Sequence, residues 1–470
     1  MDFLKKILSV HKTHDNKHLI VCFLGAALKI NRAKLVLLCD KFMNLVNLSN
    51  SVNEDLKKYD IDTQIRENYS NVLEKIKEES QFRKINVIFL LNSTSCAKFS
   101  YDSLCENLLN NPKFNVKVLI SCTIAFEQNE YERKHLKEKL VSNYNYFKAK
   151  GYDVDYAYDV QKDKFIDLAI FKPDIVFYTE PWEIAYVHDI ETVSKFALTC
   201  FCIYGTSMHN GSYEYEEPFY RRLFKYFMDN YDAYDLMIQN GVNPDGLQVV
   251  GSIKLDAYLK PIDNSKIQWL SQNKKRVIYA PHHSFSSETI LKYGTFDKNY
   301  KYFLDYAKNH QDIEFIFKPH PVLKKEVVRR GLMSEREIEH YFEQWKELPN
   351  ASVYEVGDYY DMFRTSDLMI TDCNSFLSEY LPTQKPVIHL ISENSVGYNA
   401  YGLKIIGGYY KSSSNDETEK LLNSLLYDNN DPLLEKRLQI IDTSFCWNKS
   451  GAANEIIKSI ENLLKGSKNN

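Results

Sequence analysis

The sequence is poor in glycine and proline and has no apolar run long enough to cross a bilayer. It contains only 16 Gly and 13 Pro among 470 residues, which excludes a collagen-like or linker-dominated protein. The longest apolar stretch, residues 19–28, has about half the length of a membrane-spanning helix. No secretory signal is recognisable, because residues 1–9 lead into no apolar segment with a small-residue cleavage site. We therefore expect a globular protein in the cytoplasm.

Other chemical signatures are missing as well. The nine cysteines are scattered without zinc-type spacing, so we expect reduced thiols rather than disulfides or a zinc site. The net charge of −4 argues against nucleic-acid binding through bulk positive charge. There is no G-x-x-x-x-G-K loop, no G-x-S-x-G elbow and no G-x-G-x-x-G fingerprint. Asp-x-Asp occurs only at residues 60–62 and 153–155, neither of them at the end of an expected strand, so we predict no essential metal.

Short apolar segments alternate with helical patterns twice along the chain. In the first series we expect strands at residues 86–91, 115–121, 174–178, 200–204, 235–238 and 248–250. In the second we expect them at residues 277–280, 314–317, 352–354, 368–370 and 387–390. This alternation is typical of doubly wound parallel sheets. We predict an α/β protein of GT-B type, with two Rossmann-like domains, residues 84–262 and 263–470, facing a cleft.

Residues 1–83 form a separate N-terminal segment. Its first 48 residues hold eight Lys/Arg against three Asp, and apolar clusters alternate with the lysines. We predict a basic, amphipathic helical extension that contacts an anionic membrane surface at the inner face of the cell membrane. The alternative is a structural extension packed on the first domain. Residues 49–83 are polar with apolar residues at helical spacing, which predicts a connecting helix.

The most informative segment lies at residues 367–381. Its apolar residues 368–370 predict a buried strand, and a polar turn leads from there directly into a helix. Such a turn places free backbone N–H groups at the carboxyl edge of a sheet, which is how many folds hold a phosphate. We therefore predict that Thr371, Asn374 and Ser375 bind the phosphates of a nucleotide-activated donor. Glu379, one helical turn further on, is predicted to accept from ribose hydroxyls, or else is a solvated or capping carboxylate.

Histidines follow two other strands of the second series. His320 lies in Lys318-Pro-His-Pro321, where the prolines stiffen the loop, and we predict a catalytic or phosphate-contacting role for it. Lys318 is predicted to stabilise negative charge on the leaving phosphate. His282 is a second catalytic candidate, and His283 and Ser284 are predicted to bind the donor. The alternative for these loop residues is ordinary loop packing.

The first domain offers acceptor-side candidates. His209 follows a Gly-Thr pair, and Glu180 and Glu183 follow an expected strand with Trp182 between them. Histidine and carboxylate side chains can accept a proton from an attacking hydroxyl, and a Trp ring can stack on a sugar. We therefore include His209 and Glu180 among the catalytic candidates, with structural roles as the alternative.

Four segments, in order, resemble the CDP-glycerol glycerophosphotransferase family, the teichoic-acid polymerase-like GT-B enzymes. Residues 204–206, Tyr-Gly-Thr, resemble its Trp-His-Gly-Thr motif, and residues 251–256 are similar to its Gly-x-Pro-Arg-x-Asp. Residues 279–281 and 318–321 are similar to its Tyr-Ala-Pro and His-Pro segments. Residues 371–375 stand where the family has Thr-Asp-Tyr-Ser-Ser.

This resemblance implies roles for individual residues. His320 inherits the role of the family's active-site histidine in His-Pro, and Asn374 and Ser375 inherit phosphate binding. The family's other catalytic histidine falls on Tyr204, which is a departure, since a phenol with a typical pKa of about 10 is a poor base at neutral pH. The arginine of Gly-x-Pro-Arg-x-Asp is Lys254 here, which keeps the charge but loses the forked geometry.

The resemblance also implies an activity. We expect transfer of a glycerophosphate or related phospho-substituent from a CDP-activated donor to a hydroxyl of a cell-surface glycan, such as a teichoic acid or capsular polysaccharide, or of a lipid-linked precursor. Three alternatives stay open: a GT-B glycosyltransferase that uses a nucleotide sugar in capsule or lipopolysaccharide synthesis, a transferase for another CDP-linked group such as a phosphoramidate, and a non-catalytic nucleotide-sugar-binding scaffold. Beyond the nucleotide-activated donor itself, we expect no cofactor.

Overall fold

The computed structural model describes residues 61–124, 130–206, 208–210, 218–267, 269–271, 273–285, 291–355, 358–445 and 447–465, together with the strand backbones at 8–12, 18–23 and 26–31. The chain divides into two compact units, Met1–Glu67 and Asn68–Asn470. None of the helices in these residues is long and apolar enough to cross a bilayer.

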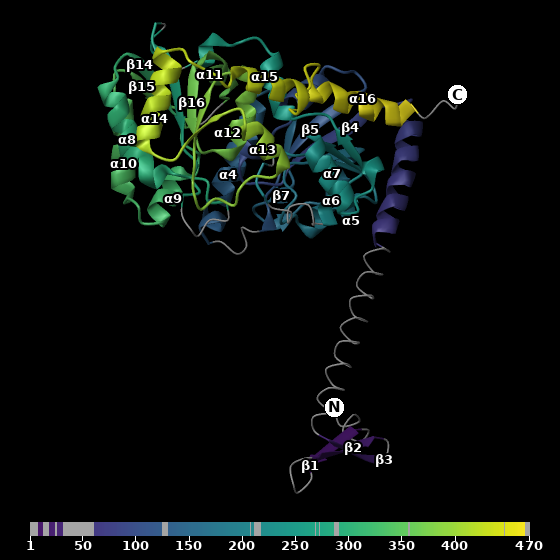
Figure 1. The fold of residues 1–470 in the computed structure, drawn as a ribbon. Helices are drawn as coiled ribbons and strands as arrows, with labels where there is room; N and C mark the ends of the chain where they lie inside the picture. Colours follow the sequence, from purple (N-terminus) through teal and green to yellow (C-terminus); the bar gives the residue numbers. More distant parts are fainter. Residues whose placement is uncertain are drawn as a thin grey trace. The chain divides into compact units, whose positions relative to one another are not determined.

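The first unit contains a three-stranded antiparallel sheet. Its strands are β1 (Leu8–Lys12), β2 (His18–Phe23) and β3 (Ala26–Asn31), with β2 in the centre (Figure 1). This differs from the helical extension predicted here. The central strand is rich in β-branched and aromatic residues, which favour strands over helices. The rest of residues 1–48 lies outside the described residues, so contact of this segment with a membrane stays a prediction.

The predicted connecting helix is present over residues 61–79. Its part within the second unit is anchored on the first large sheet. The Tyr69 hydroxyl bonds the Thr199 side chain and donates to the Arg222 carbonyl at 2.9 Å. Asn68 donates to the Ser194 hydroxyl at 3.2 Å. These bonds attach the helix to elements far along the chain.

Seven parallel strands form the first large sheet. Their spatial order is β12 (Leu247–Val249), β11 (Lys225–Met228), β10 (Leu198–Cys202), β9 (Ile175–Tyr178), β4 (Ile85–Leu91), β5 (Phe114–Ile120) and β6 (Val154–Tyr156). The helices between them are α3 (Asp102–Leu109), α4 (Glu130–Ala149), α5 (Ile190–Val193), α6 (Pro218–Arg222) and α7 (Tyr231–Gln239). The strand order reverses between β4 and β9, which makes their carboxyl ends the expected ligand edge.

One strand prediction is wrong. Residues 235–238 lie inside helix α7, whose first turn is capped by the Asn230 side chain accepting the Ala233 N–H at 2.8 Å. The strand of this region is β11, a few residues earlier. A four-residue apolar run has no period that separates a strand from a buried helix face, so the pattern misplaced this element.

Six parallel strands form the second large sheet. Their order is β15 (Ala351–Val353), β14 (Ile313–Phe317), β13 (Lys275–Ala280), β16 (Leu368–Thr371), β17 (Val387–Leu390) and β18 (Tyr410–Ser412). The helices are α8 (Phe296–Asn309), α9 (Leu323–Arg329), α10 (Glu335–Lys346), α11 (Tyr360–Thr365), α12 (Asn374–Glu379), α13 (Ala400–Ile406), α14 (Asn415–Leu422), α15 (Leu434–Thr443) and α16 (Ala452–Lys465). Here the order reverses between β13 and β16.

Apolar side chains cover both faces of the second sheet. Along β13, Val277 and Tyr279 join one core cluster with residues of α8 and α10, whereas Ile278 and Ala280 join another with residues of α11 and α13. Successive strand residues point to opposite faces, so a strand buried on both sides is apolar throughout. This layered arrangement (Figure 1) leaves the strand ends as the places where polar side chains can gather.

The last helix returns to the first sheet. The Asp256 carboxylate accepts the N–H groups of Ala452 and Ala453 at 2.8 and 2.9 Å, at the start of α16. Further along this helix Ser459 donates to Gln248 at 2.6 Å. The strands of the two large sheets fall on either side of the predicted boundary at residues 262–263, and we call the parts before and after it the first and the second half. Helix α16 (yellow in Figure 1) belongs to the second half in sequence but packs on the first half.

Candidate active site

The carboxyl edge of the second sheet brings four predicted site residues together. His282 and His283 follow β13, whereas Lys318 and His320 follow β14. Backbone hydrogen bonds tie the two loops, since the His320 N–H donates to the Pro281 carbonyl at 3.1 Å. Neighbouring parallel strands end at the same edge, so residues almost forty positions apart become neighbours.

The three histidines form one cluster. Ring centroids are 4.2 Å apart for His282–His283 and His283–His320, and 4.9 Å apart for His282–His320. Burial lowers the pKa of His283 to about 4 and that of His320 to about 3, and it lowers the pKa of His282 well below its usual value. All three imidazoles are therefore neutral at pH 7. None of the three histidines has the pKa near 7 that suits a general base.

The hydrogen bonds of the cluster favour one tautomer. Nδ1 of His282 accepts the Ser284 N–H at 3.3 Å, and Nδ1 of His320 accepts the Val322 N–H at 3.3 Å. An Nδ1 that accepts leaves the ring proton on Nε2. The ring nitrogens lie within 4.8 Å of one another, a spacing that could hold a metal ion, but Nε2–H groups are donors that suit an anion better. The absence of an essential metal stays a prediction.

Asp372 organises this edge. Its fully buried carboxylate accepts the His282 N–H at 2.6 Å, and it accepts the N–H and the hydroxyl of Thr295 at 2.5 and 2.8 Å. Burial raises the pKa of Asp372 to about 6, against the opposing effect of these bonds. The side chain thus joins the end of β16 to the histidine loop and to the start of α8. We did not single it out from the sequence, although its place in the polar turn was a signal.

Lys318 is the buried cation of this edge. It is only 4% exposed, and its ammonium lies 5.3, 4.9 and 5.5 Å from the ring centres of Tyr354, Tyr359 and Phe376. Among the described residues it makes no ion pair within 4.0 Å. Burial lowers its pKa to about 8, and the nearby charge of Lys254 adds to this. Cys373 and Glu379 oppose this shift, but no carboxylate of the described residues lies within ion-pair distance of the Lys318 ammonium.

Two of the predicted donor-binding hydroxyls are engaged inside the protein. The Ser284 hydroxyl contacts Nδ1 of His282 at 2.7 Å and accepts the Tyr293 N–H at 3.1 Å. The Thr371 hydroxyl donates to the Ala280 carbonyl at 2.6 Å and accepts the Cys373 N–H at 2.9 Å. Both side chains position the loops around them. Direct contact of either with a phosphate stays a prediction.

Asn374 and Ser375 begin helix α12. Asn374 is 9% exposed, and its buried Oδ1 has no hydrogen-bond partner in the described part of the chain. Ser375 is partly buried, with its hydroxyl 3.5 Å from the Cys373 sulfur. Both side chains stand beside the end of β16, next to the histidine loop. Their predicted contact with donor phosphates stays a prediction.

Glu379 is buried and occupied. It is 1% exposed and pairs with Lys254 at 3.2 Å, and its carboxylate accepts from the hydroxyls of Tyr359 and Tyr360. The alternative of a solvated glutamate is therefore wrong. A ribose hydroxyl would have to join or displace the tyrosines, so ribose binding stays a prediction. Because Lys254 belongs to the first half, this ion pair also joins the two halves.

The carboxyl edge of the first sheet carries a different cluster. Glu180, 8% exposed, follows β9, and Lys98 lies 3.4 Å from its carboxylate. The same ammonium donates to the Tyr204 hydroxyl at 2.6 Å and lies 5.9 Å from the ring centre of Trp182. Glu183 is exposed in the adjoining loop. Sequence reasoning missed Lys98, because nothing in its local sequence marks it.

His209 lies at the junction of the two halves. It is 8% exposed and forms a β-bridge with Tyr398, while the Asn399 N–H donates to the Met208 carbonyl at 2.9 Å. A Cβ placed on Gly402 would lie 2.4 Å from that carbonyl, so only glycine permits this approach. A catalytic role for His209 stays a prediction.

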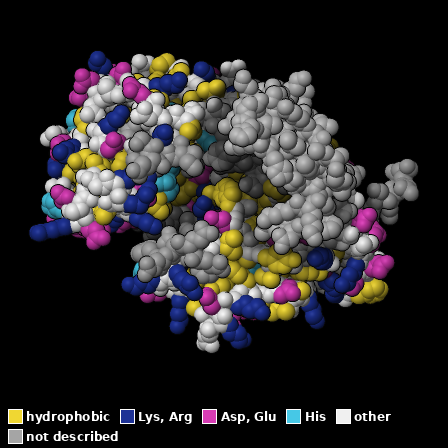
Figure 2. All heavy atoms as spheres, turned by 90° about the horizontal axis from the view of Figure 1, so that it is seen from below, with side chains coloured by type: hydrophobic (Ala, Val, Ile, Leu, Met, Phe, Trp, Pro, Cys, Tyr) yellow, Lys and Arg dark blue, Asp and Glu magenta, His cyan; other side chains and the backbone are white. Residues whose placement is uncertain are grey.

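The two strand edges face each other. The charge of Lys98 in the first half contributes to lowering the pKa of His320 in the second, after burial, His283 and Lys318. Figure 2 shows that this face of the molecule is hollowed near its centre, with histidine, acidic and basic side chains around the hollow. The arrangement can hold an anion on one side and a proton acceptor on the other.

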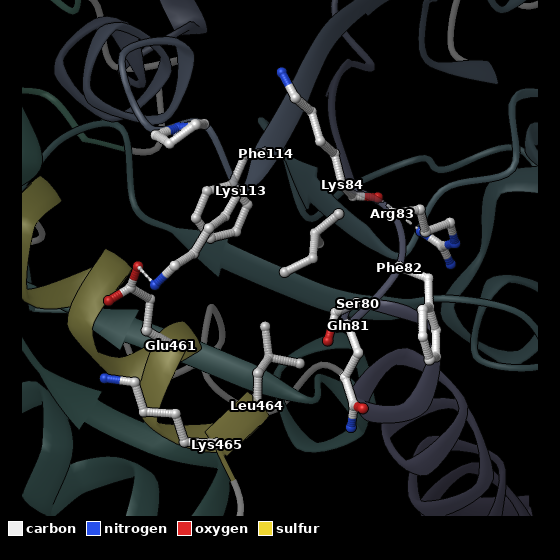
Figure 3. Close-up of a pocket in the computed structure, with 12 residues that line it drawn as sticks. Ser80, Gln81, Phe82, Arg83, Lys84, Lys113, Phe114, Glu461, Leu464 and Lys465 are labelled. Carbon is white, nitrogen blue, oxygen red and sulfur yellow. Dashed lines mark hydrogen bonds and ion pairs between the residues drawn. The ribbon is translucent and has the colours of Figure 1, made fainter.

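A separate pocket of about 520 Å³ lies elsewhere (Figure 3). It is lined by the starts of β4 and β5, by residues 80–84 and by the end of α16, where Glu461 pairs with Lys113 at 2.9 Å. The amino ends of parallel strands lie opposite their carboxyl ends. This pocket is therefore not part of the candidate site.

Comparison with known proteins confirms the family resemblance. Residues 264–461 match the family model of CDP-glycerol:poly(glycerophosphate) glycerophosphotransferases. The match covers the second sheet with its histidine loops, and it supports the prediction of a transferase. No curated protein matches the chain.

Solved structures confirm the fold. The chain is similar to a UDP-N-acetylglucosamine 2-epimerase from Listeria monocytogenes, with a TM-score of 0.53 and 16% identity over 82% of this chain and 98% of that one. It is similar to the UDP-GlcNAc 2-epimerase of Neisseria meningitidis bound to UDP-GlcNAc, with a TM-score of 0.50 and 14% identity over 80% and 100%. S. aureus MnaA with UDP gives a TM-score of 0.51 and 13% identity over 81% and 97%. Such identities show the GT-B fold alone.

Proposed function

We propose that this protein transfers a glycerophosphate or a related phospho-substituent from a CDP-activated donor to a hydroxyl of a cell-surface glycan or of its lipid-linked precursor. The match of residues 264–461 to the glycerophosphotransferase family supports the donor class. The two facing sheets supply a donor edge and an acceptor edge. The donor edge is the end of β13, β14 and β16, at the reversal of strand order.

The observation that carries the proposal is the buried ammonium of Lys318, which forms no ion pair within the described part of the chain. Burying an ammonium without a counter-ion is costly unless a ligand supplies the missing charge. A diphosphate at this edge would meet Lys318 together with the Nε2–H groups of His282 and His320. Since those imidazoles are neutral, they bind as hydrogen-bond donors, and a bound phosphate would raise their pKa values.

In the proposed reaction the acceptor oxygen attacks the phosphorus that carries the glycerol. The bond from this phosphorus to the oxygen of CMP breaks in line, and CMP leaves with the electron pair. Negative charge grows on the departing phosphate, where Lys318 and the histidine N–H groups stabilise it. Fixed donors that need no rearrangement lower such a barrier most.

One observation favours a second candidate. Tyr204 stands where the family has a catalytic histidine, and similar folds include a UDP-GlcNAc 2-epimerase bound to UDP-GlcNAc. The anion site described above would also take the diphosphate of a nucleotide sugar. A GT-B glycosyltransferase is therefore the competing function, and the base of the nucleotide distinguishes the two.

A thermal-shift and calorimetric panel tests the proposal. The purified full-length chain is titrated with CDP, CDP-glycerol, UDP-sugars and GDP-sugars, since a ligand that binds only the native state raises the melting temperature. We expect a shift with CDP and CDP-glycerol, and CMP release on addition of acceptor. A shift with UDP- or GDP-sugars alone would refute the CDP donor and support sugar transfer.

Lys318→Met is the matching variant, and Lys324→Met is its control. Lys324 belongs to the same half and lies 4.1 Å from the ring centre of Phe342, but it pairs with Glu339 and Glu355 at 3.2 and 3.1 Å. We expect Lys318→Met to lose the CDP shift and Lys324→Met to keep it. Equal CDP binding in both variants would remove Lys318 from the donor site.

A further inference from the structure

The cluster of Lys98, Glu180 and Tyr204 lies at the ligand edge of the first sheet, apart from the residues assigned above to the donor. Lys98 comes from the turn after β4, Glu180 from the end of β9 and Tyr204 from the segment after β10. Its three members are joined by an ion pair of 3.4 Å and a hydrogen bond of 2.6 Å. Ligand-binding and catalytic residues of open α/β sheets gather at this kind of edge, so we ask which step of the reaction this cluster serves.

We propose that Glu180 is the base that takes the proton of the attacking acceptor hydroxyl, with Lys98 and Tyr204 as the positioning residues that hold its carboxylate. This rests on the transferase function proposed above, but it holds for a phosphoryl or a sugar donor alike. Neither Lys98 nor the assembly of the three residues is apparent from the sequence.

The Asn92 side chain fixes the backbone of Glu180 and of the residue before it. Asn92, at the end of β4, accepts the N–H groups of Thr179 and Glu180 at 3.1 Å each, and its amide donates to the Glu180 carbonyl at 2.7 Å. The Thr179 hydroxyl adds a bond of 3.0 Å to the same amide. A base held by the central strands of a sheet keeps the fixed geometry that proton transfer requires.

The position of Glu180 suits an in-line displacement. The leaving nucleotide is held by Lys318 and the histidine cluster in the second half, so the attacking oxygen must approach from the opposite side of the reacting centre. The first-sheet edge is that side, and Lys254 of the first half pairs with Glu379 of the second half at 3.2 Å, in agreement with the effect of the Lys98 charge on His320. A base on the donor side would stand behind the leaving group.

Tyr204 explains how the site works without the family's histidine. Its hydroxyl oxygen already accepts from the Lys98 ammonium, and a neutral phenol is a weak base, so Tyr204 is poorly suited to take the acceptor's proton. The Glu180 carboxylate has lone pairs for that purpose. Lys98 lies 4.0 Å from the Tyr204 ring centre as well, which places the ammonium against the ring and beside the carboxylate.

The proton and electrons of the step balance. The acceptor O–H bond breaks and its proton moves to a Glu180 oxygen, while the acceptor oxygen forms the new bond to phosphorus. The bond from phosphorus to CMP breaks, and CMP keeps its electron pair. Lys98 keeps its proton throughout and afterwards stands beside a neutral carboxyl, which then returns its proton to water.

Chemical rescue separates a base from a structural carboxylate. CMP release from CDP-glycerol is measured with excess glycerol as the hydroxyl probe, for wild type, Glu180→Ala and Lys98→Met. We expect Glu180→Ala to lower kcat by about 10²–10⁴-fold, the usual contribution of a general base, with the Kd for CDP unchanged. Added formate is expected to restore part of the Glu180→Ala rate, and methylammonium part of the Lys98→Met rate. Formate without effect on Glu180→Ala would overturn the proposal.

Lys150→Met is the matched control. Lys150 resembles Lys98, since its side chain is 32% exposed against 33%, it pairs with Asp102 at 2.8 Å and it lies 4.5 Å from the ring centre of Tyr146. We expect this variant to release CMP at the wild-type rate, and we expect added methylammonium to leave that rate unchanged. A Lys98→Met variant that behaves in the same way would refute the positioning role.

The identity of the released nucleotide tests the donor independently of the role of Glu180. Release of UDP or GDP from sugar donors by wild type, in place of CMP, would reject the CDP donor, and the same variants measured with that sugar donor would still decide the role of Glu180. Wild-type turnover of no nucleotide donor at all would overturn both proposals.

Discussion

The two strand edges that face each other differ in how their charges are paired. At the second sheet, Lys318 is buried against three aromatic rings with no ion pair recorded among the described residues. At the first sheet, Lys98 is partly exposed and paired with Glu180. An unpaired buried cation is unstable until an anion arrives, whereas a paired one is satisfied in the empty protein. This difference agrees with the proposed roles, charge binding at the second-sheet edge and proton transfer at the first-sheet edge.

Both edges nevertheless use the same device to fix a loop. Asp372 in the second half and Asn92 in the first are buried side chains that accept from backbone groups of a neighbouring strand end. Each lies beside the reversal of strand order in its sheet. Each side chain thereby holds the loops at the ligand edge of its sheet in a fixed position.

The largest effect is expected from removing these two side chains. Asp372→Ala leaves the His282 N–H and both Thr295 groups without an acceptor, so we expect a loss of about 3–5 kcal/mol in the free energy of unfolding. Asn92→Ala removes neutral bonds only, and we expect about 2–3 kcal/mol. Urea denaturation followed by circular dichroism measures both. Equal losses would show that the charge of Asp372 contributes nothing to its edge.

Exchanging the two lysines for methionine is expected to give opposite changes in stability. Lys318→Met removes an unpaired buried charge whose pKa has fallen from 10.5 to about 8, and we expect a gain of about 1–3 kcal/mol at pH 7. Lys98→Met leaves Glu180 unpaired, and we expect a loss of about 1–2 kcal/mol. Thermal melts in the absence of nucleotide compare the two. A loss of stability in Lys318→Met would mean that the aromatic rings outweigh the desolvation of the charge.

The pH dependence follows from the same lysine. The pKa of Lys318 is lower in the folded than in the unfolded protein, so its buried ammonium lowers the free energy of unfolding. This destabilisation is fully present below about pH 8 and disappears as the pH rises toward 10.5. The stability gain of Lys318→Met is therefore expected to shrink above pH 8. CDP affinity of the wild type is expected to fall over the same range, by about 10–100-fold, because the ammonium that pairs with phosphate loses its proton. Calorimetry of CDP binding from pH 6.5 to about 9.5 tests this, and a flat profile would contradict it.

A smaller effect is expected at the junction between the two edges. In Gly402→Ala the new methyl would meet the Met208 carbonyl at 2.4 Å, so the two halves must move apart. We expect a loss of about 1–3 kcal/mol, as in other overpacked sites, and a larger drop in kcat than in CDP affinity. In the proposed mechanism CDP binds to the second half alone, whereas transfer needs both halves. An unchanged kcat would show that the edges do not need this separation.

The smallest effect is expected from removing metal. Dialysis against EDTA is expected to leave CMP release unchanged, because Lys318 and the histidine N–H groups supply the positive side of the site. If a metal does bind, the His282–His283–His320 cluster is the expected place, since the spacing of its ring nitrogens could hold a metal ion. Loss of activity that zinc restores would show that this edge is a metal site and not an anion site made by Lys318 and histidine N–H groups.

The fold was largely predictable because it depends on patterns within short segments. Strands that are buried on both faces are apolar throughout, and β13, β14, β16 and β17 were all placed correctly to within a few residues. The prediction failed where the pattern was short or one-sided, as at residues 235–238 in α7. The N-terminal sheet was missed because its basic, apolar composition suits a helix as well as a strand.

The sequence alone therefore determined which residues stand at strand ends: the histidine loops, Lys318, Glu180 and the polar turn at residues 371–375. Only the tertiary structure decided which of them are paired. Lys98 reaches Tyr204 across 106 positions, and Lys254 reaches Glu379 across 125. The order of strands in a sheet and the contact between the two halves determine which residues become partners. Neither the strand order nor this contact can be recognised from a short segment of the sequence. Since burial and pairing set the pKa values and the free charges, the chemistry of this site became visible only in the folded protein.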